Sequence, residues 1–392
     1  MINKEGWDRK KLGDICETTS GGTPNRSNRG YYEGTIPWVK SGELDKGLIL
    51  DTEEKITVEA LKNSSAKLFP KGTLLIALYG ATIGKLAFLG VEACTNQAIC
   101  GIFKNDKIDS EFLYYFLLYK KPSLINKGVG VGQPNISQSI LKDLEIPVPS
   151  IIIQQQIVSE LDVLSNIITK KKEQLVDLDK LAQATFYDMF GDPVNNEKGW
   201  KVKKLGDLGN FKNGLNYTNS ETGISIKILS VSNFKSNIIL RNLEQLGYVG
   251  LDSEPNEDYY LKEKDIVFVR SNGSKELVGR SLLMGQIQEK ITFSGFCIRF
   301  RLEINEIIPL FLIYILTNEH FKKNLIEQGR GANINNVNQQ MLSGKVIILP
   351  PISIQSNFIG KIESIEKQKE LINKSIDDVQ QLFNYTMDKY FN

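Results

Sequence analysis

Two long stretches of the chain repeat an apolar residue at alternating intervals of four and three positions. They cover about 151–190 and 352–391, and neither contains an internal proline. An apolar seam with an average period of 3.5 residues is typical of paired helices. At 1.5 Å per residue, each helix would extend about 60 Å. The seam positions are Ile157, Leu161, Leu164, Ile168, Leu175, Leu178, Ala182, Thr185 and Met189 in the first stretch, and Phe358, Ile362, Ile365, Ile372, Ile376, Val379, Phe383, Thr386 and Tyr390 in the second.

The same seams have a second explanation, in which each helix packs only on the core of its own domain. Two matched helices that each close a repeat favour pairing with one another. A lysine, Lys171 or Lys369, occupies one seam position in each helix. The first helix should end at Gly191-Asp192-Pro193, because glycine caps helix C-termini and proline commonly follows them.

The remainder of the chain alternates short apolar runs with Gly, Asn and Ser. Residues 73–78 and 265–270 are examples of such runs, and they predict β-strands bounded by turns. A short apolar helix should follow in each half, at 111–120 and at 310–318. The predicted fold class is α+β, with two globular domains separated by two long helices that form an antiparallel coiled coil.

The two halves of the chain are copies of one another. The string Trp-Asp-Arg-Lys-Lys-Leu-Gly-Asp at 7–14 returns as Trp-Lys-Val-Lys-Lys-Leu-Gly-Asp at 200–207, and further matches follow in the same order. So many collinear matches indicate an internal repeat with a pseudo-twofold axis. We therefore divide the chain into a first domain (1–149), a first helix (150–191), a second domain (192–350) and a second helix (351–392). The further matches pair residues 71–76 with 263–268, Ile83-Gly84-Lys85 with Val278-Gly279-Arg280, Asn135 with Asn336, and Gln154 with Gln355.

Composition narrows the class of protein. The chain has 392 residues, of which 41% are hydrophobic, and this favours folded domains over disorder. The formal net charge is only +2, from 48 basic and 46 acidic residues, so nucleic acid could be bound only through local patches. Four cysteines without metal-site spacing, and no signal peptide or membrane-spanning run, lead us to expect a soluble cytoplasmic protein.

Patterns that carry catalysis are missing from the sequence. His320 is the single histidine, and no Cys/His group has zinc-site spacing. Gly80-Ala81-Thr82-Ile83-Gly84-Lys85-Leu86 is one residue short of a phosphate-binding loop, and it has leucine where a Mg²⁺-binding hydroxyl belongs. Glu53-Glu54-Lys55 matches the tail of a nuclease motif but is interpreted as a solvated turn. We predict a non-catalytic chain with no cofactor or metal of its own.

Glycine-rich loops recur at equivalent places in the two halves and carry side chains suited to DNA. Arginine pairs well with guanine, Asn and Gln pair with adenine, and Lys, Ser and Thr hold phosphates. Such loops are more often simple turns, but here the framework repeats while the polar residues differ. Tyr79-Gly80 stands against Arg270-Ser271, for example, and Gln133 against Ile334. The predicted DNA-binding residues are Thr23, Lys40, Tyr79, Thr82, Lys85, Gln133, Asn135, Arg270, Asn272, Ser274, Arg280, Arg330, Asn333 and Asn335.

The order of these parts resembles the specificity subunits of Type I restriction-modification enzymes. The resemblance covers essentially the whole chain, and the order of the motifs is more specific than any one of them. The second half has Phe211-Lys212-Asn213-Gly214-Leu215-Asn216 where the first has its Gly-Gly-Thr-Pro turn. The motifs are Thr19-Ser20-Gly21-Gly22-Thr23-Pro24, Gly34-Thr35-Ile36-Pro37-Trp38-Val39, Thr95-Asn96-Gln97 and Arg270-Ser271-Asn272-Gly273-Ser274.

The resemblance implies a function. Each domain would read one part of a split, asymmetric site in double-stranded DNA, and the helices would set the unread gap. Two methyltransferase subunits that bind S-adenosylmethionine would dock on the chain, and restriction subunits that hydrolyse ATP would join them. Two alternatives stay open, namely a paired-domain scaffold that binds protein or RNA, and an enzyme of unrecognised type.

Overall fold

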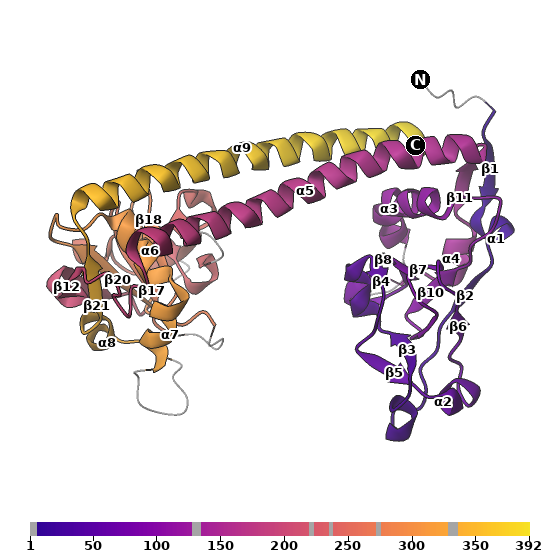
Figure 1. Cartoon of the computed structure of the whole chain (residues 1–392), viewed down its shortest axis with the longest axis horizontal. Coiled ribbons are helices and arrows are strands. Elements are labelled where there is room, and N and C mark those ends of the chain that lie inside the picture. Colours follow the sequence, from indigo (N-terminus) through magenta and orange to yellow (C-terminus); the bar gives the residue numbers. More distant parts are fainter. Residues whose placement is uncertain (1–5, 128–134, 219–222, 235–237, 272–275, 328–335) are drawn as a thin grey trace. The chain divides into compact units, whose positions relative to one another are not determined.

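The computed structural model describes residues 6–127, 135–218, 223–234, 238–271, 276–327 and 336–392. The chain divides into two compact units, Met1–Glu173 with Asn373–Asn392, and Gln174–Ile372. Each unit therefore combines one α+β domain with part of both long helices (Figure 1).

Two mixed sheets and a short two-stranded ribbon build the first domain. The central strands β7 and β10 are entirely buried, as expected for strands covered on both faces. Small helices cap the sheets: α1 (Leu12–Ile15), α2 (Val58–Lys62) and α4 (Gln138–Lys142). The five-stranded sheet has the order β2 (Thr18–Ser20), β10 (Ile99–Ile102), β7 (Leu74–Ala77), β8 (Leu86–Leu89), β4 (Leu48–Ile49); the four-stranded sheet has β5 (Glu54–Ile56), β3 (Ile36–Val39), β9 (Ala93–Thr95), β6 (Leu68–Phe69); the ribbon pairs β1 (Asp8–Lys11) with β11 (Glu145–Val148).

The five-stranded sheet and the ribbon recur strand for strand in the second domain, whose other sheet has three strands among the described residues instead of four. Even the parallel pairs recur, since β4 with β8 and β3 with β9 correspond to β15 with β18 and β14 with β19. The internal repeat predicted from the sequence is thus a repeat of architecture. The five-stranded sheet has the order β13 (Gly209–Asn213), β20 (Cys297–Leu302), β17 (Ile266–Val269), β18 (Ser281–Met284), β15 (Ile239–Leu240); a second sheet has β16 (Gly247–Leu251), β14 (Ile224–Leu229), β19 (Ile291–Phe293); the ribbon pairs β12 (Lys201–Lys204) with β21 (Val346–Leu349).

The short helix expected in each half is present, but its length differs from the prediction. In the first domain, α3 (Ser110–Lys127) continues past the predicted end and through Pro122. In the second, α6 (Pro309–Thr317) stops and α7 (Glu319–Glu327) starts again. The side chain of Asn318 accepts the backbone N–H of His320 at 2.9 Å and so caps α7, which explains the break. Helix α8 (Gln339–Ser343) is the counterpart of α4.

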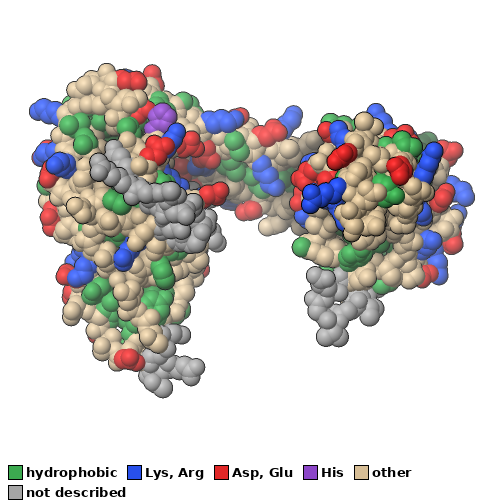
Figure 2. All heavy atoms as spheres, turned by 90° about the horizontal axis from the view of Figure 1, so that it is seen from below, with side chains coloured by type: hydrophobic (Ala, Val, Ile, Leu, Met, Phe, Trp, Pro, Cys, Tyr) green, Lys and Arg blue, Asp and Glu red, His purple; other side chains and the backbone are tan. Residues whose placement is uncertain are grey.

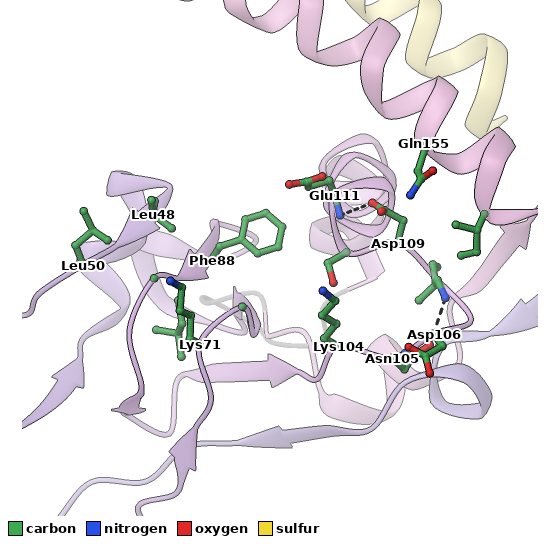
Figure 3. A pocket seen from close by; sticks show the side chains of 16 residues that line it. Leu48, Leu50, Lys71, Phe88, Lys104, Asn105, Asp106, Asp109, Glu111 and Gln155 are labelled. Carbon is green, nitrogen blue, oxygen red and sulfur yellow. Dashed lines mark hydrogen bonds between the residues drawn. The ribbon is translucent and has the colours of Figure 1, made fainter.

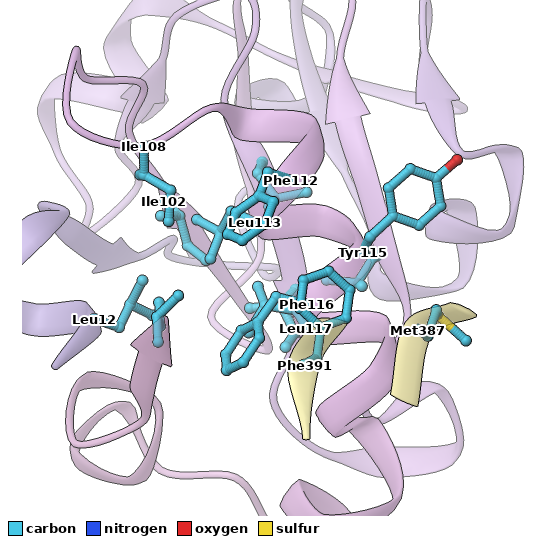
Figure 4. Close-up of a cluster of buried hydrophobic side chains, with 14 of the residues drawn as sticks. Leu12, Ile102, Ile108, Phe112, Leu113, Tyr115, Phe116, Leu117, Met387 and Phe391 are labelled. Carbon is cyan, nitrogen blue, oxygen red and sulfur yellow. The ribbon is translucent and has the colours of Figure 1, made fainter. Parts of the chain in front are cut away.

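Both predicted long helices are confirmed, as α5 (Ile151–Phe190) and α9 (Ile352–Phe391). In the first unit, the end of α9 runs antiparallel to the start of α5 and packs on α3. The ring of Phe391 lies 5.3 Å from that of Phe112 and 5.6 Å from that of Phe116 (Figure 4). Tyr119 donates a hydrogen bond of 2.7 Å to Asp388 of α9.

In the second unit, the start of α9 meets the end of α5 in the same way. Phe358 packs against Phe190 of α5, with the ring centres 5.3 Å apart. The seam lysine Lys369 forms an ion pair of 2.8 Å with Asp179 of α5, so its charge is neutralised where it enters the seam. Residues of both seams also belong to the hydrophobic cores of the domains. The helices therefore pair with one another and also pack on the domain cores, so both explanations of the seam hold.

A buried glutamine attaches each long helix to the domain before it. The amide oxygen of Gln154 accepts the backbone N–H of Asp109 at 2.7 Å, and its amide nitrogen donates to the carbonyl of Pro149 at 2.8 Å. Gln355 accepts from Ile308 at 2.9 Å and donates to Pro350 at 2.8 Å. Both side chains are fully buried, so these bonds satisfy backbone groups that water cannot reach.

Candidate nucleic-acid interface

Four segments of the first domain meet beyond the end of β7. Leu78 donates its backbone N–H to Ala98 at 2.8 Å and accepts from Ile136 at 2.8 Å. Tyr79 forms an isolated β-bridge with Asn135. Gly22 donates to the carbonyl of Thr95 at 2.9 Å, which brings in the glycine-rich turn. We call these segments, 21–24, 78–85, 96–98 and 135–136, the first loop cluster.

Equivalent segments of the second domain meet through the same backbone bonds. Arg270 donates to Phe296 at 2.8 Å and accepts from Val337 at 2.7 Å, while Ser271 bridges to Asn336. The second loop cluster thus comprises the described parts of 214–217, 270–280, 294–296 and 336–337.

These bonds correct the alignment of the loops by one residue. The sequence comparison set Tyr79-Gly80 against Arg270-Ser271, but the hydrogen-bond partners match Leu78 with Arg270 and Tyr79 with Ser271. The error is physical in origin, because strand register is decided by pairing with distant segments. Arg270 consequently replaces a buried leucine and is itself half-buried.

The departure from the Gly-Gly-Thr-Pro turn in the second half does not change the backbone path. Gly214 donates to Cys297 at 3.0 Å and Leu215 to Phe293 at 2.8 Å, as Gly21 donates to Ile99 at 3.1 Å in the first domain. A Cβ atom at Gly214 would lie 2.1 Å from the carbonyl oxygen of Ser294, so glycine is required here. Asn216 therefore occupies the place of Thr23.

The described candidates of the first domain lie in the first loop cluster, apart from Lys40, which adjoins it. Thr23 hydrogen-bonds to the exposed Gln97, and Thr82 lies in the turn between Tyr79 and Lys85. Lys40 follows Val39, whose carbonyl accepts the backbone N–H of Asn96 at 3.0 Å. The remaining candidates, Gln133, Asn272, Ser274, Arg330, Asn333 and Asn335, lie outside the described residues.

Acidic partners accompany the candidate lysines of the first domain. Lys40 forms ion pairs of 2.6 Å with Glu53 and 3.3 Å with Glu54, and Lys85 pairs with Asp45. The hydrogen bond from Lys40 lowers the pKa of Glu53, and the same contact raises the pKa of Lys40. A DNA phosphate would have to compete with these carboxylates for the lysines.

Two basic side chains, Arg280 and Lys322, lie close together at the second cluster. Arg280 bonds to the carbonyls of Glu276 at 3.3 Å and Phe234 at 3.4 Å, and Lys322 of α7 donates to Glu276 at 2.7 Å. Burial and the nearby charge of Arg280 lower the pKa of Lys322, although the carboxylate of Glu276 partly offsets them. An incoming anion would relieve this crowding of positive charge. On the face drawn in Figure 2, basic and acidic side chains are otherwise interspersed over both units.

Sequence reasoning missed two residues of these clusters and one lysine beside the second cluster. Gln97 and Phe296 are exposed at the tips of equivalent loops, and Lys322 lies beside Arg280. A signal for Lys322 existed, because the match of Asn135 with Asn336 also aligns Lys121 with Lys322. A Cβ atom at Gly84 would lie 3.0 Å from Cγ of Lys121, so this lysine is similarly placed in the first domain.

A hollow of about 630 Å³ in the first unit is a separate feature. Figure 3 shows Phe88, Lys71 and Lys104 among the side chains around it, with Glu111 hydrogen-bonded through its backbone to Asp109. Its wall includes Gly72, just before β7, whereas the loop cluster lies beyond the other end of that strand. The hollow is therefore not part of the candidate interface.

Among the residues that the structure describes, no group of three or more His, Cys, Asp or Glu side chains could hold a metal ion. In the same residues, no helix is long and apolar enough to cross a membrane. His320 is accounted for, since its Nδ1 bonds to the carboxylate of Asp192.

Comparison with known proteins decides the family. The model of the Type I restriction modification DNA specificity domain matches twice, at residues 4–177 and 197–381. The chain belongs to this family. Each match covers one α+β domain and most of the long helix that follows it, as the repeat requires. It is thus a DNA sequence-specificity subunit of a Type I restriction-modification system.

Individual relatives agree along the full length. The specificity subunit of the Type I restriction enzyme MjaIX from Methanocaldococcus jannaschii is 29% identical, over 93% of this chain and 89% of its own. The StySPI specificity subunit from Salmonella potsdam is 24% identical, over 95% and 85%. The crystal structure of the Type I S subunit from M. genitalium shares the fold, with a TM-score of 0.51 and 16% identity over 100% of this chain and 98% of that one. A structure concerning complex assembly of the type I R-M system has a TM-score of 0.64 at 17% identity, over 99% and 98%.

Proposed function

We propose that this specificity subunit recognises a two-part, asymmetric site in double-stranded DNA, and that each loop cluster reads one part. One observation carries the proposal. The clusters share their backbone hydrogen bonds, yet Thr23, Tyr79 and Ala98 of the first correspond to Asn216, Ser271 and Phe296 of the second. Equal frameworks with different side chains would read different base pairs in the same manner.

A domain exchange tests the two-module reading. Replacing residues 192–350 by the equivalent domain of a relative should change one half of the methylated sequence and leave the other half intact. The measurement is methylation mapping of DNA from cells that carry the system. An exchange of 1–149 is the matched control and should change the opposite half. A change in both halves after either exchange would contradict the proposal.

We further propose that the chain does no chemistry and positions partners in the cytoplasm. Two methyltransferase subunits, which bind S-adenosylmethionine, and ATP-hydrolysing restriction subunits would assemble on it. A methyltransferase that flips its target base must be brought to that base, and this chain would bring it there. Exposed apolar side chains on the helices support docking; on α9, Leu382 is 50% and Tyr385 67% exposed, one turn apart.

Replacing Leu382 and Tyr385 together by serine tests the docking. Co-purification with the methyltransferase subunit should weaken, while the isolated chain keeps its melting temperature because both side chains are already in water. Unchanged assembly would remove this face from the interface. Labelled S-adenosylmethionine should bind the assembled complex and not the isolated chain.

The helices are proposed to set the distance between the two half-sites. Lys170-Lys171-Lys172 interrupts the seam of α5, and a four-residue insertion there is a stutter that a coiled coil can absorb. The insertion adds about 6 Å of helix, or about two base pairs of DNA. Methylation mapping should find both half-sites unchanged with a wider gap. A soluble, active variant with the parental gap would contradict this part.

The alternative scaffold that binds protein or RNA is distinguished by a gel-shift titration. The assembled complex should bind duplex DNA containing the mapped site more tightly than a scrambled duplex or an RNA of the same length. Equal binding to all three would favour the alternative.

A further inference from the structure

The second loop cluster has one exposed aromatic side chain at a place where the first has a buried alanine. Phe296 is 61% exposed at the turn between β19 and β20. A phenyl ring left in water gives up the favourable free energy that its burial would provide. Ala98 holds the same place in the first domain and is 6% exposed, with its carbonyl accepting the backbone N–H of Leu78.

The backbone beneath Phe296 is held at several points. Its carbonyl accepts the N–H of Arg270 at 2.8 Å, and its N–H donates to the hydroxyl of Ser294 at 3.3 Å. Gly295 donates to the carbonyl of Leu215 at 2.6 Å, and Cys297 to that of Ser294 at 2.8 Å. The ring therefore projects from a turn that hydrogen bonds hold in place. The phenyl side chain is not needed to form this turn, because alanine occupies the same place in the first domain.

The neighbouring segments of the cluster carry polar side chains. Arg270 and Ser271 follow β17, Asn336 bridges to Ser271, and the amide oxygen of Asn216 would lie 2.1 Å from a Cβ atom at Gly295. The arginine can donate to base edges, and the serine and asparagines can donate and accept, whereas a phenyl ring can do neither. In the DNA major groove the apolar feature of a base pair is the 5-methyl group of thymine.

We propose that Phe296 contacts the 5-methyl group of one thymine in the half-site read by the second domain. The proposal rests on the proposed function and deepens it, because it names a specificity-determining residue and the chemical group that it reads. The first domain, with Ala98 in this place, would have no such contact.

Deoxyuridine, which lacks the methyl group, provides the test. The full chain is assembled with its methyltransferase subunits, and its affinity is measured for duplexes carrying the mapped site with each thymine replaced in turn. One replacement in the second half-site should weaken binding about fourfold, the effect of one buried methyl or methylene group. The variant Phe296→Ala should bind the thymine duplex more weakly and lose its sensitivity to that replacement. Phe296→Leu, which stays apolar, should keep part of it.

Matched controls separate this contact from a general effect. Tyr248 of β16 is 66% exposed in the same domain, and Tyr248→Ala should leave the response to deoxyuridine unchanged. Replacements in the first half-site should affect the parent and Phe296→Ala alike. Melting temperatures of all variants should match, because the side chains already lie in water.

Each other outcome has a distinct meaning. If the parent complex does not distinguish the mapped site from a scrambled duplex, the proposed function itself fails. If the parent complex does distinguish them, but no deoxyuridine replacement loses its effect in Phe296→Ala, the inference about Phe296 is wrong. Equal loss of affinity on mapped and scrambled duplexes would make the ring a sequence-independent contact. Loss of the methyltransferase subunits would make it a protein contact, and either result overturns the inference.

Discussion

The five-stranded sheets of the two α+β domains have the same strand order, but the domains have different interiors at the start of the central strands. In the first domain, Phe69 stacks on Phe103 at 5.7 Å, and Gly101 leaves room for the ring of Phe69. In the second, Arg299 replaces Gly101, and Arg301 replaces Phe103 and forks onto the buried carboxylate of Asp265 with two bonds of 2.7 Å. At this one place, the fold therefore tolerates either apolar packing or a buried ion pair.

The loop clusters differ in the same manner, since shared backbone bonds support unlike side chains. This architecture is therefore specified by hydrogen-bonded strands and by the buried glutamines of the long helices. Interior and surface side chains can then diverge between the copies.

The largest effect on stability should come from the ion pair that only the second domain has. Asp265→Ala leaves the guanidinium of Arg301 without its partner in a largely buried place and should cost about 3 kcal/mol of unfolding free energy. The equivalent Thr73→Ala in the first domain removes one hydrogen bond, from Thr73 to the carbonyl of Pro70 at 2.8 Å, and should cost about 1 kcal/mol. Denaturant titrations measure both. Similar costs would show that the two interiors are energetically alike.

The buried glutamines should behave as equals. Gln154→Ala and Gln355→Ala each strand a buried backbone N–H and carbonyl, so each should lower stability by about 2 kcal/mol. Gln155 is exposed next to Gln154, and Gln155→Ala should change stability little. The thermal unfolding of all three variants is compared with the parent. A large asymmetry between Gln154 and Gln355 would break the equivalence of the two helix attachments.

The basic side chains of the two loop clusters should differ in how much they contribute to DNA affinity. Arg280 lies beside Lys322 and bonds to the backbone carbonyls of Glu276 and Phe234, whereas Lys85 pairs with the carboxylate of Asp45. If Arg280 contacts phosphate, Arg280→Ala should weaken binding to all sequences by about 1 kcal/mol and reduce the salt slope by about one. Lys85→Ala should do less. A loss restricted to one base pair would instead make Arg280 a guanine reader, and the same assay applies to Arg270.

The smallest effect concerns the segment that leads from α5 into the second domain. Burial favours a raised pKa for Asp192, but hydrogen bonds from His320 and from the backbone of Val194 and Asn195 outweigh it and lower the pKa. A carboxyl with a lowered folded-state pKa stabilises the protein above its unfolded-state pKa, and this contribution is lost as pH falls through the folded-state value. Asp192→Asn should therefore cost below about 1 kcal/mol at pH 7, with the difference from the parent shrinking below about pH 4 and vanishing only below the lowered folded-state pKa. A difference that persists in acid would exclude the charge as its cause.

Much of the fold was predictable, because helices and strands leave periodic patterns. The seam of α5 and α9 and the collinear matches between the halves predicted both long helices and the repeat. The prediction for 310–318 missed α7, since the capping bond of Asn318 depends on one side chain. Of the candidate site residues, the described ones of the first domain lie in one cluster, with Lys40 beside it, and their contact with DNA stays a prediction.

By itself, the sequence determined which segments become helices and strands, that the chain is a repeat, and where the polar loops fall. These are local or periodic properties, and each copy supports the other. Only the tertiary structure decided that Arg270 corresponds to Leu78, that Lys40 and Lys85 have acidic partners, and that Phe296 stands in water where Ala98 is buried. Register, ion pairing and exposure arise between segments far apart in the chain, so no local pattern records them.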